Sequence, residues 1–356
     1  MFSIVYGHES EFDGPIQTIF WPLANRLAAM DQYQCRSFAL FDDDREHTPE
    51  ETKIAVEAIL SVTNNNILAI GPTAAAALLG DKWTSMPVNS GMTYVLPTWH
   101  NVTVCWSVSA ALAGGNDGKD PLAWVGDALA HWRKPQFAVP LTIPDWVEYS
   151  PGMLGGHASV GIDTEGTPED PLCMTVASPG LRVFVDAVDV ARAWRELEGK
   201  RHVYHNAPWD WRVLESLGVF EPWRQSYIDT MEKAYIRQTE PQGLKDLGKR
   251  HFGVDMVSWE DTVMPRYGEL VQAMADGVIA AGTKVTTHSP KTGRLYKKPK
   301  VEYSPEAKRL VKLKDPLKIA DALKFEKPTL RHVPYEEFVE YATLDPYVTY
   351  YLGNTL

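Results

Sequence analysis

Apolar and polar positions in the first 135 residues follow the periods of strands and helices in turn. Short apolar runs predict strands at 2–7, 37–44, 66–70 and 102–109, and amphipathic or small-residue stretches predict helices at 16–30, 48–62, 71–80 and 121–132. Thr48, Pro49 and Glu51 form the capping-box pattern of a helix start. Strands that alternate with helices predict an α/β unit with a largely parallel sheet.

A proline-rich stretch separates this unit from the second half of the chain. Four prolines between residues 133 and 156 exclude an interior helix or a central strand. We therefore expect a domain at 1–135, a linker at 136–156 and a second domain at 157–356.

In the second domain, closely spaced strands are followed by helices. The apolar runs at 159–166, 172–178 and 181–187 predict an antiparallel meander, and a further strand is expected at 201–206. Helical spacing follows at 189–199, 207–218, 227–238, 243–253 and 334–352. A mixed sheet covered by helices is expected.

Composition narrows the class of protein. The chain has 356 residues, of which 44% are hydrophobic, enough for two packed cores. It begins at Met1 without a basic and apolar leader, and no apolar run approaches the roughly 18 residues of a membrane span, so we expect a cytoplasmic protein without a membrane partner. Cys35, Cys105 and Cys173 are widely spaced and predict buried thiols rather than a disulfide or a zinc site.

Charge is distributed unevenly along the chain. The net charge of −11 argues against a general nucleic-acid coat protein. Residues 281–332 nevertheless hold 14 Lys and Arg against five Asp and Glu, a net charge of +9, which leaves −20 for the rest. A basic island on an acidic body suits contact with a phosphate backbone, and a solvated charged helix and loop is the alternative interpretation.

Three short segments hold the candidate chemistry. Asp163 and Glu165 are two apart on a predicted strand and therefore share one face. Asp210 lies in the first turn of the helix that follows the fourth strand, and Tyr341 and Asp345 lie one above the other on a helix face. Taken alone, each segment has an ordinary structural explanation: a strand end, a favourable helix-dipole contact and a surface pair.

Together, the order and spacing of these segments resemble the three motifs of DnaQ-like 3′–5′ exonucleases of the DEDDy subgroup, closest to the proofreading domain of family A DNA polymerases. The motifs stand here as Asp163-Thr-Glu165, Asn206-Ala-Pro-Trp-Asp210 and Tyr341-Ala-Thr-Leu-Asp345-Pro-Tyr-Val-Thr349. The resemblance covers about 160–265 and 333–352. It implies an RNase H-like (DnaQ-like) exonuclease domain with a mixed sheet.

The resemblance also implies roles for individual residues. Two divalent cations, Mg²⁺ or Mn²⁺, would be held by oxygen ligands of the kind that hard cations prefer, namely Asp163, Glu165, Asp210 and Asp345. Tyr341 would orient the attacking water. Thr164 and Asn206, the latter also the expected N-cap of its helix, would hold the terminal nucleotide, and Lys245 would contact phosphate.

The chain departs from the family pattern at two places. Pro346 directly follows Asp345, disfavours helical conformation there and removes a helix hydrogen bond; a kink would shift this ligand, although we still expect activity. The 134 residues between Asp210 and Asp345 include a basic insertion at about 266–332, which we expect to grip single-stranded DNA or to contact a partner polymerase.

The first domain resembles the uracil-DNA glycosylase superfamily, family 4-like, in its segments at 64–80, 92–104 and 121–132, and His100 matches the histidine that stabilises the uracil oxyanion. This implies a three-layer α/β fold. The expected Gly-x-x-Pro-Gly loop is missing, two cysteines cannot hold an iron–sulfur cluster, and residues 1–156 carry 8 Lys and Arg against 17 Asp and Glu. We expect a domain without glycosylase activity.

The leading hypothesis is a 3′–5′ exonuclease that acts on single-stranded DNA 3′ ends, proofreading in phage-like replication beside a separate polymerase subunit or a missing polymerase domain. Its location would then be the host cytoplasm. The alternatives are an RNase D-like RNA-trimming exonuclease, a non-catalytic module that binds nucleic acid or tethers a polymerase, and a uracil-binding or uracil-excising protein.

Overall fold

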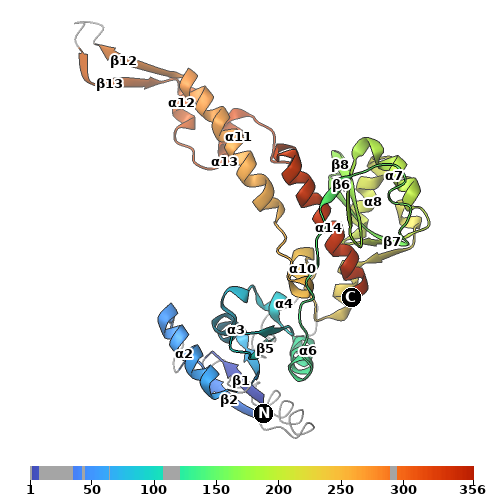
Figure 1. The fold of residues 1–356 in the computed structure, drawn as a ribbon. Helices are drawn as coiled ribbons and strands as arrows, with labels where there is room; N and C mark the ends of the chain where they lie inside the picture. Colours follow the sequence, from blue (N-terminus) through green and yellow to red (C-terminus); the bar gives the residue numbers. More distant parts are fainter. Residues whose placement is uncertain (1, 8–34, 42–44, 64, 107–120, 289–294) are drawn as a thin grey trace.

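The chain is an α/β protein with two main sheets and a separate two-stranded hairpin at the end of a helical arm (Figure 1). The structure is a computed structural model and describes residues 2–7, 35–41, 45–63, 65–106, 121–288 and 295–356. None of the described helices is both long and apolar enough to cross a membrane.

The first sheet has the strand order β2-β1-β3-β5-β4. The parallel strands are β1 (Phe2–Tyr6), β2 (Cys35–Ala39), β3 (Asn66–Ile70) and β5 (Asn101–Cys105), and β4 (Thr93–Val95) is antiparallel to β5. Its helices are α2 (Pro49–Val62), α3 (Gly71–Leu79), η3 (Gly80–Lys82), α4 (Met86–Asn89) and α6 (Pro121–Arg133). The predicted largely parallel sheet is confirmed, and the helix predicted at 16–30 lies outside the described residues.

Local sequence explains how these elements begin and pack. The predicted capping box is confirmed: the Thr48 hydroxyl accepts from the Glu51 amide at 3.2 Å, and the Glu51 carboxylate accepts from the Thr48 amide at 2.8 Å. Alternate residues of β3 enter opposite cores, because Leu68 packs toward α6 whereas Ile67 and Ala69 pack toward α3. A parallel sheet covered on both faces accounts for the continuous apolar strands.

The second sheet is mixed, with the order β11-β10-β7-β8-β9-β6. Its strands are β6 (Trp146–Glu148), β7 (Ser159–Gly166), β8 (Pro171–Ser178), β9 (Leu181–Asp186), β10 (Arg201–Tyr204) and β11 (Tyr227–Asp229). The predicted antiparallel meander is confirmed by β7, β8 and β9. Strands β10 and β11 extend the sheet in parallel beyond β7, and β6 pairs in parallel with β9 at the other edge.

Two local expectations were wrong. The proline-rich segment is more than a linker, because it supplies the edge strand β6 and the fully buried Leu154; an edge position tolerates the flanking prolines. The helix expected from 227 starts only at Thr230, since 227–229 pair with β10 as strand β11. Asp229 then caps that helix by accepting from the Met231 amide at 2.8 Å.

Helices cover both faces of the mixed sheet (Figure 1). They are η4 (Ala187–Asp189), α7 (Val190–Leu197), α8 (Ala207–Ser216), η5 (Pro222–Arg224), α9 (Thr230–Arg237), α10 (Leu244–Phe252) and α14 (Tyr335–Thr355). Val160 and Ile162 of β7 pack into the core formed with α7 and α8. The alternate residues Gly161, Asp163 and Glu165 therefore face α14, which crosses the sheet from β6 to β10.

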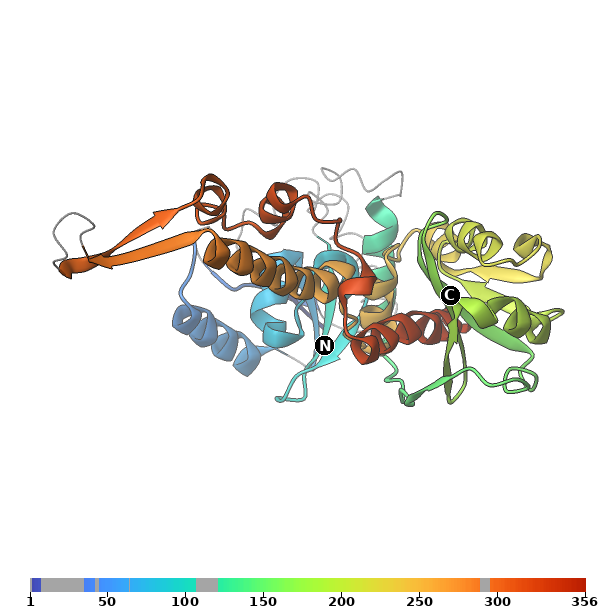
Figure 2. The ribbon, with the colours of Figure 1, turned by 90° about the horizontal axis from the view of Figure 1, so that it is seen from above.

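The segment between α10 and α14 forms an arm that projects away from both sheets (Figures 1 and 2). It consists of α11 (Trp259–Ala281), β12 (Thr283–His288), β13 (Leu295–Tyr303), α12 (Pro305–Leu310), α13 (Pro316–Leu323) and η6 (Leu330–His332). The arm thus starts before the predicted insertion boundary at 266. Strands β12 and β13 pair in an antiparallel hairpin, whose turn lies outside the described residues.

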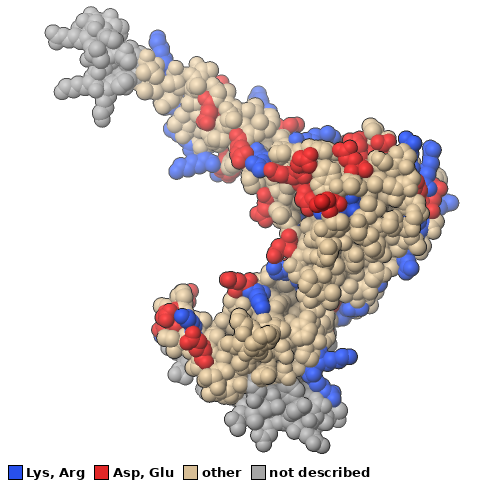
Figure 3. Space-filling model, in the orientation of Figure 1, with Lys and Arg blue, Asp and Glu red and all other residues tan. Residues whose placement is uncertain are grey.

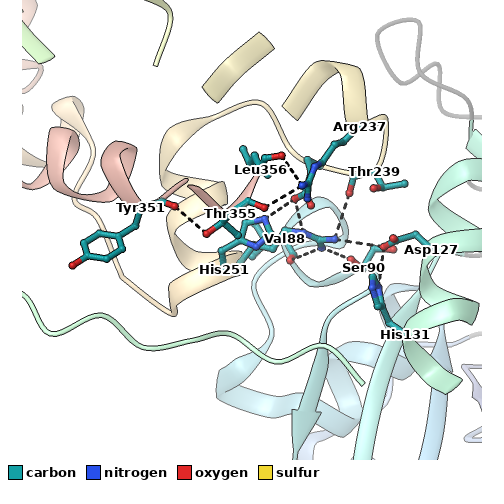
Figure 4. A network of polar contacts seen from close by, with 12 residues as sticks. Val88, Ser90, Asp127, His131, Arg237, Thr239, His251, Tyr351, Thr355 and Leu356 are labelled. Carbon is teal, nitrogen blue, oxygen red and sulfur yellow. Dashed lines mark hydrogen bonds and ion pairs between the residues drawn. The ribbon is translucent and has the colours of Figure 1, made fainter. Parts of the chain in front are cut away.

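Arg250 joins the two halves of the chain, and its partners Val88, Ser90 and Asp127 lie opposite Thr239 in a network of polar contacts (Figure 4). This α10 side chain is 1% exposed, and its Nε donates to Glu240 Oε2 at 2.8 Å. Toward the first half, it donates to the carbonyl of Ser90, lies 3.7 Å from Asp127 Oδ2 and stacks 5.7 Å from the Trp124 ring centroid. The first sheet is therefore docked on the second through a buried, fully used guanidinium.

Replacing Arg250 with Met should lower the free energy of unfolding by about 3–5 kcal/mol, because the buried Glu240 carboxylate would lose its ion pair with Arg250 and keep its contact with His251, at 2.9 Å. The additional change Glu240→Gln should recover part of this loss by removing the buried charge. Urea unfolding measures both effects. Arg212→Met, at an exposed side chain on α8, is the control and should change stability by less than about 1 kcal/mol; an equal effect of the two arginine variants would contradict this role for Arg250.

Candidate active site

Strand β7 presents two carboxylates toward α14. Asp163 pairs in register with Thr175 of β8, and Glu165 pairs with Cys173. The strand ends directly afterwards at Gly166, where φ is +101° and an added Cβ would lie 2.4 Å from the Asp170 carbonyl oxygen. Glycine is required at this turn, which places Glu165 at the end of the strand.

The sheet opens beside these carboxylates. Strand β10 pairs with β7 only as far as Gly161, so the amide of Thr164 has no strand partner on that side. Asp210, in the first turn of α8 and 2% exposed, takes its place: Oδ1 accepts from the Thr164 amide at 3.0 Å and from the Thr164 hydroxyl at 2.8 Å. The second motif is thereby fixed to the first by two hydrogen bonds.

Asn206 does not act as the side-chain N-cap that the sequence predicts. It stands at the N-cap position of α8 but adopts a left-handed conformation with φ of +73°, and its side chain makes no capping hydrogen bond. Asp229 of β11 supplies the cap instead, accepting from the Asn206 amide at 3.2 Å and from the Ala207 amide at 2.8 Å. The exposed Asn206 side chain is left one turn from Asp210.

Helix α14 carries Tyr341 and Asp345 to the same place. It approaches β7 so closely that a Cβ on Gly161 would lie 2.1 Å from the carbonyl oxygen of Pro346. This contact places Asp345, the residue before Pro346, beside Asp163. Tyr341 lies one turn earlier on the same helix.

Pro346 does not interrupt the helical conformation at Asp345, because α14 runs as one helix from Tyr335 to Thr355. Proline has no amide hydrogen, so the carbonyl of Ala342, four residues earlier, loses its helical donor. The buried hydroxyl of Thr175 donates to this carbonyl at 3.1 Å and also lies 3.3 Å from the Asp163 carbonyl. Thr175 thus replaces the missing donor and ties the backbone of β7 to α14.

A buried arginine supports the same turn of α14. Arg182 of β9 is 2% exposed and donates to the carbonyl of Glu340 at 2.9 Å and to the Thr343 hydroxyl at 2.9 Å. It also forms a 2.8 Å ion pair with the Glu340 carboxylate. Sequence reasoning missed Thr175, Arg182 and Gly161, since a hydroxyl, a cation or a glycine in an apolar strand carries no motif signal.

Lys245 of α10 lies beside the acids of the site. Its Nζ lies 5.0 Å from the ring centroid of Tyr341 and contacts the carbonyl of Val257. Its charge lowers the pKa values of Asp163 and Glu165, although burial and the neighbouring carboxylates outweigh it. The predicted phosphate contact therefore lies at the site and not on a remote surface.

The electrostatics of the site are those of crowded, buried acids. Burial, followed by the charges of the neighbouring carboxylates, raises the pKa values of Asp163 and Glu165 well above the usual range. Burial raises the pKa of Asp210 to about 8, against the hydrogen bonds from Thr164, and that of Asp345 to about 6. Four acids from β7, α8 and α14 thus share one low-dielectric region.

A cleft of about 710 Å³ opens beside Tyr341 and Asp345, between α14, the start of α11 and the loop before it. Its apolar lining includes Met256, Val257, Pro265 and Leu344. Its remaining side chains are largely acidic: Asp255, Asp261, Glu336, Glu337 and Glu340, with Arg266. Arg266 is engaged with Glu337, which leaves the cleft electronegative.

The four carboxylates are chemically suited to hard divalent cations, but they are not arranged as a complete metal site. Among the described residues, no three His, Cys, Asp or Glu side chains form a group that could hold a metal ion. Asp210, for example, directs Oδ1 to Thr164. The carboxylate oxygens are nevertheless the ligand type that Mg²⁺ and Mn²⁺ prefer, and a bound cation would reverse the raised pKa values. The two predicted cations stay a prediction.

No protein-family model matches this chain, and no curated protein sequence matches it. The case for a function therefore depends on the site itself.

The role of Thr175 can be tested with Pro346 in a double-mutant cycle. Thr175→Val should lower the free energy of unfolding by about 1–3 kcal/mol, because it leaves a buried carbonyl without a donor. In a Pro346→Ala background the cost should be smaller, since residue 346 then offers its own amide to Ala342. Urea unfolding of the four proteins measures the coupling.

The matched control is Thr103→Val, at a buried strand threonine whose hydroxyl pairs with Thr93 at 2.9 Å in the other sheet. Its effect should add to that of Pro346→Ala. Additive behaviour of Thr175→Val as well would show that the hydroxyl does not replace the missing amide.

The raised pKa of Asp210 predicts that the stability of the metal-free protein depends on pH. The pKa of Asp210 is about 8 in the folded state, above the unfolded value near 3.9, so between these pH values the folded state binds more protons than the unfolded state. The free energy of unfolding of the metal-free protein therefore decreases as pH rises from about 4 to 8. Asp210→Asn keeps an acceptor for Thr164 and should gain stability over the wild type by an increasing amount from pH 5 to 8, reaching a few kcal/mol. Unfolding in EDTA at each pH measures the difference. Asp145→Asn, at an exposed acid, should show no such trend, and a flat Asp210→Asn difference would contradict the raised pKa.

Proposed function

We propose that this chain is a metal-dependent 3′–5′ exonuclease that hydrolyses the terminal phosphodiester of DNA. The observation that carries the proposal is the convergence of Asp163 and Glu165 on β7, Asp210 on α8 and Tyr341 and Asp345 on α14. Their sequence positions span three motifs, yet each carboxylate lies close enough to shift the pKa of another. Crowded acids of this kind are a recognised feature of catalytic sites.

The sheet around the site also supports the proposal. A three-stranded antiparallel meander extended from its first strand by two parallel strands is the arrangement of an RNase H-like sheet, and β7 is that first strand. The unbroken course of α14 through Pro346 favours catalysis over a module with a spoiled site. For the first half we propose a glycosylase-like scaffold without activity, docked through Arg250.

In the proposed reaction, Asp163, Glu165 and Asp345 would hold one divalent cation, and Asp163 and Asp210 a second. When bound, such cations supply Lewis-acid assistance to phosphodiester hydrolysis. Thr164 keeps Asp210 oriented through its two hydrogen bonds. Tyr341, Lys245 and Asn206 would act on the attacking water and on the bound DNA.

Tyr341 acts as a hydrogen-bonding phenol and not as a base. Burial, together with the charges of Glu165 and Asp345, raises its pKa, so the hydroxyl keeps its proton at neutral pH and can orient the attacking water. The ammonium of Lys245 beside the ring would offset charge on the scissile phosphate. Asn206, exposed at the start of α8, is placed to contact the terminal sugar or base.

A 5′-labelled single-stranded DNA should be shortened from its 3′ end in Mg²⁺ or Mn²⁺, and Asp163→Ala should reduce the rate on the order of 100-fold or more. Asp145→Ala, at an exposed acid, should leave it unchanged. Absence of metal-dependent shortening would contradict the proposal. Equal rates on RNA and DNA would favour the RNA-trimming alternative, and release of free uracil from uracil-containing DNA would assign activity to the first half.

A further inference from the structure

The arm ends in a hairpin that the described parts of the two sheets and their helices do not cover. Strands β12 and β13 pair with each other, and their principal packing partner is α12 at the base of the hairpin. The register partners Val285 and Val301 are 57% and 47% exposed, and Tyr303 is 43% exposed. An isolated two-stranded hairpin is marginally stable in water, so an exposed apolar pair on it favours a function in binding.

Most of the exposed basic side chains of the arm have no ion pair with the described residues. Near the body, Arg331 pairs with Asp170 at 2.5 Å and Arg266 with Glu337 at 2.5 Å. Exposed basic side chains without an ion pair to the described residues lie along and beside α13, namely Lys314, Lys318, Lys324 and Lys327, and toward the far end, namely Lys284, Lys308, Arg309 and Lys312. Residues 283–303 contain six Lys and Arg and one acid.

These charges do not serve the body of the protein. Everything outside residues 281–332 carries a net charge of −20, and acidic side chains gather where the arm meets the rest of the molecule (Figure 3). Lys and Arg that project outward from an acidic protein attract a polyanion. Because they continue from a site proposed to cut phosphodiesters, nucleic acid is the polyanion that the arm fits.

The length of α11 and the shape of the hairpin favour a DNA duplex over a single strand as the ligand of the arm. Asp261 and Pro265 at the start of α11 line the same cleft as Tyr341 and Asp345, and the hairpin follows the other end of this 23-residue helix. At 1.5 Å per residue α11 spans about 35 Å, the length of roughly ten base pairs of DNA. A two-stranded β-ribbon also fits the major groove of duplex DNA.

We propose that the arm binds duplex DNA about one helical turn behind the 3′ end held at the active site. Lys284, Lys308, Arg309 and Lys312 contact phosphates, and the exposed Val285–Val301 pair lies against the groove. This placement rests on the proposed exonuclease function, whereas duplex binding by the arm does not. It differs from the expectation that the basic insertion grips single-stranded DNA or contacts a partner polymerase.

Binding can be measured without cleavage, by fluorescence anisotropy in EDTA. The probes are duplexes of 6, 12 and 20 base pairs, each with three unpaired nucleotides at the 3′ end, and a single strand of matching length. Lys284→Glu, Lys308→Glu and Lys312→Glu combined should weaken binding of the 12- and 20-base-pair probes at least tenfold. The slope of log Kd against log salt concentration should fall by about three, because about three fewer counterions are released on binding. The affinity for the 6-base-pair and single-stranded probes should change little.

Two further proteins make the test selective. Lys53→Glu, Lys134→Glu and Arg195→Glu combined reverse the same charge on exposed residues elsewhere and should leave the length dependence intact. Because Thr283 and Tyr303 are register partners, Lys284–Glu302 can be replaced by a two-residue Asn-Gly turn. This shortened arm carries no reversed charge and should also weaken binding of the 12- and 20-base-pair probes, so that the loss does not depend on correct folding of the charge-reversed hairpin.

Equal weakening for all probes would overturn the proposal in favour of a single-strand grip. No weakening for any probe would overturn it in favour of a solvated arm or a protein partner. If the exonuclease proposal alone is wrong, length-dependent binding persists and the charge reversal still weakens it, but blunt duplexes bind as well as those with unpaired 3′ ends.

Discussion

The close approach of α14 to β7 is the constraint on which the site depends. Only a glycine at 161 allows the carbonyl of Pro346 to lie against the strand, and this contact brings two carboxylates of the strand beside Asp345 and Tyr341. The approach creates two physical difficulties. Acids accumulate in a region of low dielectric, and a proline interrupts the hydrogen bonding of the helix that carries one of them.

The structure resolves the second difficulty within the protein and leaves the first unresolved. Thr175 donates to the carbonyl that Pro346 leaves free, and Arg182 holds the adjacent turn, so the helix continues through the proline. Within the described residues nothing comparable neutralises the acids, because Lys245 is a single cation against four carboxylates whose pKa values remain raised. Crowding buried acids without a neutralising cation costs stability. Acids that are kept crowded in this way by buried hydrogen bonds of the surrounding structure are typical of catalytic sites.

Sequence reasoning succeeded where a local pattern has one physical interpretation. Spacing of two on a strand and of four on a helix predicted which of Asp163, Glu165, Tyr341 and Asp345 share a face, and the capping box at Thr48 formed as expected. It failed where the outcome depends on tertiary contacts. Asn206 lost its capping role to Asp229, which is 23 residues away, and the hydrogen bond that Pro346 removes from α14 is replaced by one from a hydroxyl on another strand.

The separation of charge along the chain follows from the same constraint. A catalytic cleft built from acids repels the phosphate backbone that it is proposed to cut, so the affinity for a polyanion has to come from elsewhere in the protein. The arm begins at the edge of that cleft, and unpaired cations continue along it to its far end, beyond the paired Arg266 and Arg331. In the proposed function, the binding of DNA and the chemistry would be divided between two places about one α11 length apart. This division allows the acids to remain crowded, because the cleft itself need only receive the end of the strand.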